Sequence, residues 1–240
     1  TSNVMAKVSG ITKTNNSVYR DNHASGHCAK MTTHIETCKV LGLINIKVLA
    51  AGSIFLGDMK EPITGTKDGP KALNFGIPFT HRPKALRYDY KVQVPGTPNR
   101  IRQTGFSKVT TVPGPDYCIA MLLLQKRHED ANGNITAQRV GTVVVKYGKS
   151  TGGWVEDATY EIHYGNITGK SFYNAATMGL RSHDYARNSK GKSVLVKETG
   201  WAPADATPTH IVLQFSSSHG GAYVGTVGNT FWVDNVGLVY

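Results

Sequence analysis

The feature of this sequence that most restricts its fold is an alternation of apolar and polar residues with a period of two. It runs through residues 29–37, 85–94 and 160–164. Successive side chains of a β-strand point to opposite faces, so the pattern is typical of a strand with one face in a core and the other in solvent. No segment keeps the 3.6-residue period of an amphipathic helix for more than about two turns. The sequence therefore predicts a protein built from strands.

Continuous apolar runs and turn residues complete this pattern. Residues 117–125 and 143–147 are apolar without alternation, which predicts strands buried on both faces, although the first run also fits a turn of buried helix. Proline and glycine interrupt the chain at 95–98 and 113–116, where neither a helix nor a central strand can continue. Asn132-Gly133 lies between two strand patterns and predicts a hairpin turn.

The order of these patterns predicts the fold class. Strands follow one another through short turns and without alternating helices, which favours an antiparallel sandwich or barrel. A short helix is expected only within residues 175–187. Neither an internal repeat nor a linker divides the 240 residues. We therefore predict a single all-β domain over residues 1–240.

Charge and hydropathy narrow the range of partners. The net charge is +11, and basic residues are most concentrated at 82–108. This charge fits either a solvated cationic surface or an attraction to an anionic partner such as a sulfated or uronic-acid glycan. No helix-turn-helix, RNA-recognition signature or zinc-finger spacing accompanies it, so we do not expect a nucleic-acid partner. The longest apolar run, 117–124, is too short to cross a bilayer, so no transmembrane segment is expected in this chain.

Motifs of nucleophilic, metal and disulfide chemistry are absent from the sequence. Ser218 and His219 are adjacent, whereas the members of a catalytic triad converge from separate segments. The nine histidines form neither an H-E-x-x-H nor a His-x-His pair. Three cysteines are too few for a disulfide framework.

Carboxylates are the residues to consider if the protein is an enzyme, because glycoside hydrolysis needs two carboxyl groups that flank the cleaved bond. Glu156 and Asp157 are neighbours in sequence, so on a strand they would point to opposite faces. We interpret them as solvated charges in a loop before a strand. Acids from separate strands are the remaining choice, and Asp89 and Glu161 are our candidates for catalytic residues.

Segments at both ends of the chain resemble a known family. The start, Thr1-Ser2-Asn3-Val4, is followed by HASGHCAKMTT at 23–33 and AAGSIFLG at 50–57, and the chain closes with GTVGNTFWVDNVGLVY at 225–240. Together they resemble the putative carbohydrate metabolism domain of surface lipoproteins from Bacteroides-like bacteria. The closing Gly-x-Thr-x-x-Val-Asp-x-Val-x-Leu pattern is the most specific part. Such domains begin slightly upstream, so we expect this chain to start just inside the domain.

The resemblance implies a jelly-roll β-sandwich of two antiparallel sheets, an extracytoplasmic location at the cell surface or in the periplasm, and a glycan-related role. It supplies no catalytic residues. More distantly, the chain is similar to jelly-roll carbohydrate-binding modules, in which two acidic residues share a structural calcium ion. The matching residues are Asp21 near the start and Asp234 in the final strand. No other cofactor is expected.

We therefore expect a non-catalytic domain that binds an oligo- or polysaccharide, with an anionic sugar favoured by the charge. Sugars need planar polar groups and aromatic platforms. We expect the substrate-binding residues on the solvent-facing sides of strands and beside turns: Arg87, Asp89, Lys91, Gln125, Arg127, Trp154, Glu161, His163 and Trp201. Two alternatives stay open, namely a glycoside hydrolase or lyase, and a structural part of a surface assembly.

Overall fold

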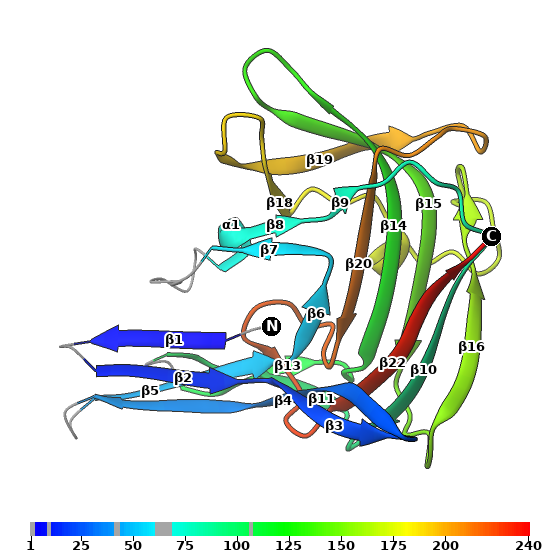
Figure 1. Cartoon of the computed structure of the whole chain (residues 1–240). Coiled ribbons are helices and arrows are strands. Elements are labelled where there is room, and N and C mark those ends of the chain that lie inside the picture. The colour runs from blue at the N-terminus through cyan, green and yellow to red at the C-terminus, as the bar shows by residue number, and fades with distance from the viewer. Residues whose placement is uncertain (1–2, 9–10, 41–43, 61–68, 106–107) are drawn as a thin grey trace.

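Two large β-sheets packed face to face form the body of the molecule (Figure 1). The computed structural model describes residues 3–8, 11–40, 44–60, 69–105 and 108–240. Strands predominate in these residues, and each of the two helices is four residues long. Smaller sheets extend from the two large ones.

The first large sheet has seven strands. Its order is β12-β5-β4-β22-β10-β16, and β3 pairs with β4 outside this path. The bounds are β3 Val18–His23, β4 Gly26–Val40, β5 Ile44–Ala51, β10 Ala85–Gln93, β12 Thr104–Gly105, β16 Val155–Glu161 and β22 Thr230–Val239. The last strand of the chain, β22, lies between β4 and β10 in the middle of the sheet.

The second large sheet has eight strands. Its order is β18-β19-β15-β14-β20-β6, with β17 paired to β15 and β9 paired to β20. The bounds are β6 Ser53–Phe55, β9 Ile77–Pro78, β14 Cys118–Glu129, β15 Ile135–Tyr147, β17 His163–Tyr164, β18 Asp184–Arg187, β19 Ser193–Trp201 and β20 His210–Ser216. Strands β15 and β19 run parallel.

Three smaller sheets and the two helices complete the described chain. The bounds are β1 Asn3–Val8 and β2 Ile11–Asn16; β7 Gly57–Met59 and β8 Leu73–Phe75; β11 Asn99–Arg102, β13 Thr110–Pro113 and β21 Val224–Gly225; and helices α1 Gly69–Ala72 and α2 Ala175–Met178. In Figure 1, β1 and β2 lie with parts of β4 and β5 in one arm, while β7, β8 and α1 lie in a second projection.

The main core lies between the two large sheets because the alternation in β10 turns one set of its side chains inward. Leu86, Tyr88 and Val92 of β10 are buried in one cluster with Leu122 and Phe215 of the eight-stranded sheet. Residues of the other set, such as Arg87, are on the outer face of the seven-stranded sheet. The alternation thus separates the core from a polar outer face.

The apolar run of β14 is buried on both faces, as its lack of alternation predicts. Leu122 and Leu124 belong to the main core, whereas Met121 and Leu123 pack with Phe75 in a second cluster. The run is a strand and not a turn of helix. The predicted hairpin is also confirmed, because β14 and β15 pair antiparallel across residues 130–134.

The predicted all-β sandwich is confirmed, with two corrections. The β15–β19 pair is parallel, whereas all other strand pairs of the described residues are antiparallel, and more than two sheets are present. The helix expected within 175–187 is the single turn of α2, where the side chain of Asn174 accepts a hydrogen bond from the Ala176 amide. No helix in the described residues has the length and apolar character that crossing a membrane requires.

Candidate functional site

A polar cavity of about 390 Å³ opens where the ends of β14, β15 and β20 meet β18 and the β8–β9 segment. Its size is in the range typical of small-molecule sites. The polar side chains of its lining come from distant parts of the chain: Asn74, Arg127, Glu129, Arg187 and His210. Small or apolar residues complete the wall: Gly76, Pro78, Ile135 and Ala186.

Arg127 is held in a fixed orientation in this cavity. Its Nε donates to Gln125 Oε1 at 2.8 Å and its Nη2 donates to the Phe75 carbonyl oxygen at 2.7 Å. No described residue accepts a hydrogen bond from Nη1. Burial lowers the pKa of Arg127 to about 10, against the opposing effect of Asp184 and Glu198. The guanidinium therefore stays charged at neutral pH, with N–H groups left for a ligand.

A buried chain of polar contacts supports Arg127 from behind. Gln125 is 1% exposed, and its Nε2 donates to Glu198 Oε1 at 2.6 Å. Glu198 also accepts from Arg139 Nε at 2.7 Å, and both of these side chains are fully buried. Because each member has a partner, the set fixes the position of Arg127 without leaving a buried charge unpaired.

The other polar groups of the cavity are also ordered by hydrogen bonds. Glu129 accepts from the backbone amide and hydroxyl of Ser189, at 2.9 and 2.6 Å, and these bonds lower its pKa. Burial, together with the charge of Arg127, lowers the pKa of His210 to about 4, so its imidazole is neutral at neutral pH. Arg187 forms an ion pair with Asp58 at 2.6 Å. The cavity thus presents a cation, an anion and a neutral imidazole.

A second polar cluster lies on the outer face of the seven-stranded sheet. One ligand atom from each of His23, Asp89 and Glu156 lies within 4.8 Å of the others. His23 Nδ1 donates to Asp234 Oδ2 at 2.8 Å, and His23 Nε2 is 3.1 Å from Glu156 Oε1. Burial lowers the pKa of His23, but the bonds to Asp234 and Glu156 outweigh it and the net shift is upward. The ring of Trp154 stacks on His23 at 3.7 Å between centroids.

Asp89 is the buried member of this cluster, with 5% of its surface exposed. Its Oδ1 accepts from the Asp157 amide and its Oδ2 from Asn235 Nδ2, both at 2.6 Å. Burial raises the pKa of Asp89, but these two hydrogen bonds, the neighbouring Glu156 carboxyl group and the charge of His23 outweigh that effect and lower the pKa, so the carboxylate is ionised at neutral pH. Asp157 and Asn235 have positive φ angles of 52° and 48°, and β10 has a register shift against each neighbour at this point.

The two carboxylates expected to hold calcium, Asp21 and Asp234, are each bound by nitrogen groups of other side chains. Asp21 Oδ2 accepts from Trp232 Nε1 at 2.9 Å and lies 3.5 Å from the Lys30 ammonium. Asp234 accepts from His23. Calcium takes six to eight oxygen ligands, and an ammonium and an imidazole beside the carboxylates do not fit that donor set. The side-chain contacts of Asp21 and Asp234 therefore do not favour the predicted calcium site.

The profile of the putative carbohydrate metabolism domain family matches residues 1–239 of the chain. The chain belongs to this family. No curated protein matches it. The description of the putative carbohydrate metabolism domain suggests a role in carbohydrate metabolism, and a saccharide partner fits that role. The family resemblance seen in the sequence is thereby confirmed.

The structure distributes the sequence-predicted residues of this carbohydrate metabolism domain over several surfaces. Arg87, Asp89 and Lys91 share the outer face of β10, as the alternation predicts: Arg87 lies 3.7 Å from Asp157, and Lys91 lies over the Trp154 ring. Asp89 and Gln125, however, are buried, whereas we expected both to be exposed. In each case hydrogen bonds from neighbouring strands or side chains replace water.

The catalytic pair suggested for an enzyme is not brought together. Glu161 on β16 pairs with Ala85 of β10. Ala85 is four residues from Asp89, so Glu161 and Asp89 are separated by about 13 Å along the strand direction. The carboxylate near Asp89 is Glu156, which we had interpreted as a solvated loop residue. Glu156 and Asp157 lie in β16, and both contact outer-face residues because the left-handed backbone of Asp157 interrupts the alternation.

The remaining predicted residues contact aromatic neighbours. His163 stacks on Phe172 at 4.2 Å between centroids. Trp201 lies 6.5 Å from the Tyr173 ring, and the Arg139 guanidinium is 5.5 Å from its centroid. Neither His163 nor Trp201 lines the cavity or belongs to the His23 cluster, although Trp201 lies against Arg139 of the buried set behind Arg127. Trp154, by contrast, belongs to the His23 cluster.

Sequence reasoning missed most of the cavity and most of the cluster. Of the cavity it identified only Arg127 and Gln125, which orients Arg127. Glu129 continues the same alternation on β14, so the sequence could have predicted it as well. The missed cavity residues are Asn74, Glu129, Arg187 and His210, and the missed cluster residues are His23 and Glu156. Apart from Glu129, no local spacing marks them, because separate strands bring them together.

Proposed function

We propose that this domain binds a saccharide without transforming it, and that the sugar occupies the polar cavity around Arg127. The observation that carries the proposal is the orientation of Arg127, whose Nε and Nη2 are fixed while Nη1 is left without a partner among the described residues. A guanidinium held in this way can donate two parallel hydrogen bonds to adjacent hydroxyls or to a carboxylate. The extracytoplasmic location implied by the family resemblance is part of the proposal.

The chemistry of the lining supports a polyhydroxylated ligand. Glu129 can accept from sugar hydroxyls, and neutral His210 can accept or donate. The apolar wall at Pro78 and Ile135 can contact the C–H face of a sugar ring. With a net charge of +11 on the chain, we expect uronic-acid or sulfated sugars to bind more tightly than neutral ones.

The test measures binding to a glycan array, followed by calorimetry with the best ligand at low and moderate salt. Arg127→Lys keeps the charge and removes the fork, and Glu129→Gln keeps the shape and removes the anion. We expect each to weaken binding about 10–100-fold, the usual cost of losing a charge-assisted hydrogen bond. Anionic ligands should also lose affinity as salt rises.

A double variant of the outer face, Arg87→Ala with Lys91→Ala, is the matched control. Both side chains carry charge on the same molecule but lie on the other large sheet. We expect its glycan binding to equal that of the parent. Loss of binding in this variant, with Arg127→Lys unaffected, would place the sugar on the outer face instead.

One observation favours a hydrolase as the second candidate. Asp89 is buried and ionised, and an oxygen of the 58% exposed Glu156 lies within 4.8 Å of it. Retaining glycosidases use two carboxyl groups about 5–5.5 Å apart. Release of reducing sugar from a glycan that the domain binds, abolished by Glu156→Gln, would establish this candidate. An absence of both binding and turnover would favour the structural role in a surface assembly.

A further inference from the structure

The His23 cluster has the composition and spacing of a metal site. Its three members come from β3, β10 and β16, strands far apart in the sequence. Ligand atoms that share one ion with bonds of about 2.0–2.2 Å lie about 3–4 Å from one another. His23 Nε2 and Glu156 Oε1 are 3.1 Å apart, and one ligand atom from each of His23, Asp89 and Glu156 lies within 4.8 Å of the others. Small side-chain rotations would bring all three onto one ion.

Asp234 orients the histidine for this role. A carboxylate only accepts, so His23 Nδ1 carries the proton of the 2.8 Å hydrogen bond to Asp234 Oδ2. The nitrogen that remains, Nε2, points at the carboxylate of Glu156. Metal-bound histidines show this arrangement, in which a second carboxylate fixes the tautomer and raises the basicity of the ligand nitrogen.

The charge around His23 also favours a cation. Three carboxylates, Asp89, Glu156 and Asp234, surround one imidazole. In the described chain, neither lysine nor arginine lies within 4.0 Å of any of the three, and His23 is the partner in both of their ion pairs. A proton on His23 leaves two negative charges in excess, whereas a divalent ion on neutral His23 leaves one. Burial of Asp89 makes this excess costly.

The site is held in shape while one side stays open to water. Each oxygen of Asp89 accepts one hydrogen bond and keeps a second lone pair for an ion. Trp154 covers one face of the His23 ring. Glu156 is 58% exposed, so an ion can reach the site and keep water in its remaining coordination positions.

The donor set selects the class of ion. One imidazole nitrogen and two carboxylate oxygens suit zinc and other first-row transition metals, whereas calcium and magnesium prefer oxygen alone. We propose that His23, Asp89 and Glu156 bind a divalent transition-metal ion of the zinc class, with Asp234 as the residue that positions His23.

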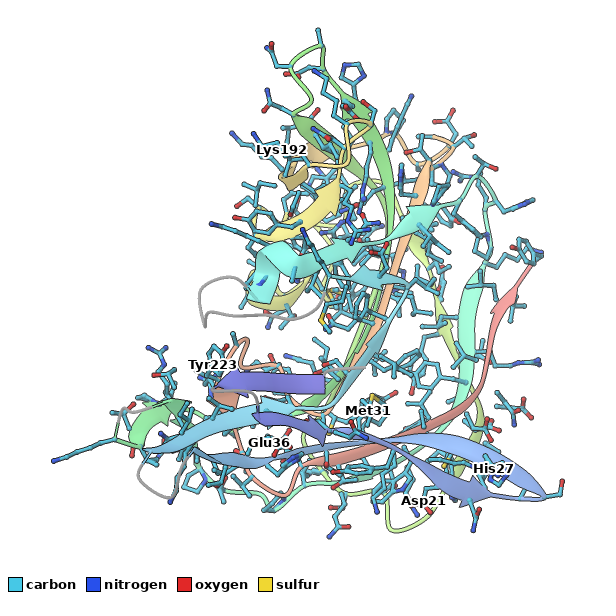
Figure 2. The ribbon with its side chains drawn as sticks, turned by 60° about the vertical axis from the view of Figure 1, so that its left-hand side comes forward. Asp21, His27, Met31, Glu36, Lys192 and Tyr223 are labelled. Carbon is cyan, nitrogen blue, oxygen red and sulfur yellow. The ribbon has the colours of Figure 1, made fainter. Side chains whose placement is uncertain are left out.

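The proposed metal site is separate from the polar cavity around Arg127. Figure 2 shows Asp21 near the tip of the β3–β4 hairpin that carries His23, far from Lys192 at the opposite end of the molecule. Lys192 follows β18, whose residues Ala186 and Arg187 line the cavity. The metal proposal therefore stands or falls independently of sugar binding.

The test is zinc binding to the full chain after treatment with a chelator, measured by calorimetry and by competition with a chromophoric chelator. We expect one zinc ion per chain and a rise in melting temperature on its addition. Glu156→Gln removes an anionic ligand at an exposed position, and Asp234→Asn removes the positioning carboxylate. We expect zinc affinity to fall at least about tenfold in both.

Glu161→Gln is the matched control, because it is the same substitution at an exposed position of the same strand, outside the cluster. Its zinc affinity should equal that of the parent. Cobalt(II) provides a second readout, since its visible absorption bands should appear in the parent and in Glu161→Gln and be lost in Glu156→Gln. Circular dichroism shows whether each variant is folded.

Three results would overturn the proposal. The first is that the parent chain does not bind one zinc ion per chain. The second is that Glu156→Gln and Glu161→Gln bind zinc equally well, and the third is that calcium displaces zinc at matched concentration, which would assign the site to an oxygen-preferring ion. A histidine that simply bridges two carboxylates through its proton would give the first result.

Discussion

Arg139 on β15 and Glu198 on the parallel strand β19 form an ion pair that is closed to solvent on all sides, with Nε and Oε1 2.7 Å apart. Glu198 also accepts from Gln125 and from the Arg181 amide. A buried pair of this kind is weak support for stability in itself, but the loss of one member leaves an uncompensated charge. We therefore expect loss of either member to disturb the pairing of β15 with β19 and, through Gln125, the orientation of Arg127.

We expect Glu198→Ala to lower the free energy of unfolding by about 3–5 kcal/mol, because it leaves the Arg139 guanidinium buried and unpaired. Urea denaturation measures this change. The double variant Arg139→Met with Glu198→Leu should be much closer to the parent, since it removes both charges. Equal losses in the single and double variants would mean that packing, and not the unpaired charge, sets the cost.

Gly76→Ala should disturb the cavity through Arg127. Gly76 has a φ of +90°, and a Cβ there would lie 2.8 Å from Arg127 Nη2 and 3.0 Å from Val212 Cγ2. Gly96→Ala is the control, because Gly96 has a φ of +72° and nothing within 4 Å of its Cβ position. Both variants share the backbone strain, about 1 kcal/mol or more. Gly76→Ala should cost at least about 1 kcal/mol more in thermal or urea unfolding, and it alone should weaken sugar binding.

His210 should titrate far below the ordinary histidine pKa of 6.5, at about 4, because it is half-buried and next to Arg127. Between these two values the unfolded chain binds a proton that the folded chain does not. This histidine therefore makes stability rise with pH over that window. NMR of the ring protons measures the pKa directly. In His210→Gln the pH dependence of unfolding between about pH 4 and 6.5 should be shallower, and titration of the parent near 6.5 would contradict the assignment.

Asp116 should stabilise the fold as an anion. Its carboxylate accepts from His219 Nδ1 at 2.7 Å, from Ser218 Oγ at 2.8 Å and from the Thr226 amide at 2.7 Å. Burial raises its pKa, but these bonds lower it below the ordinary value of 3.8. The stabilisation is present above that value and is lost as pH falls through the folded-state pKa.

Asp116→Asn should therefore cost about 2 kcal/mol or more at neutral pH. Its stability should also fall less steeply than that of the parent below about pH 4. Urea denaturation across that range is the measurement. If the free energy of unfolding fell equally steeply with decreasing pH in the two proteins, carboxylates other than Asp116 would be responsible for the loss of stability in acid.

Period-two alternation was sufficient to predict the strands and, in β10, the face on which the residues lie. In β10 it separated Tyr88 from Arg87 correctly, because an unbroken strand turns every second side chain to the same side. The turn at Asn132-Gly133 was predictable for a local reason as well, since that dipeptide tolerates the backbone of a tight hairpin.

Strand neighbours and local irregularities could not be predicted in this way. Alternation says nothing about the register in which β16 pairs with β10, so it could not choose between Glu161 and Glu156 as the partner of Asp89. The left-handed backbone of Asp157 also interrupts the alternation within β16. His23 and Asp234 are 211 residues apart in sequence and meet only through tertiary packing.

The central position of β22 has a consequence for how the molecule assembles. These ten residues are synthesised after β4 and β10, yet they lie between those two strands in the sheet. Until they emerge, both neighbours have an unpaired edge, and such edges are prone to join other chains. Pairing over such long sequence separations is also slow. A nascent chain therefore depends on protection from aggregation until β22 is available to pair with both neighbours.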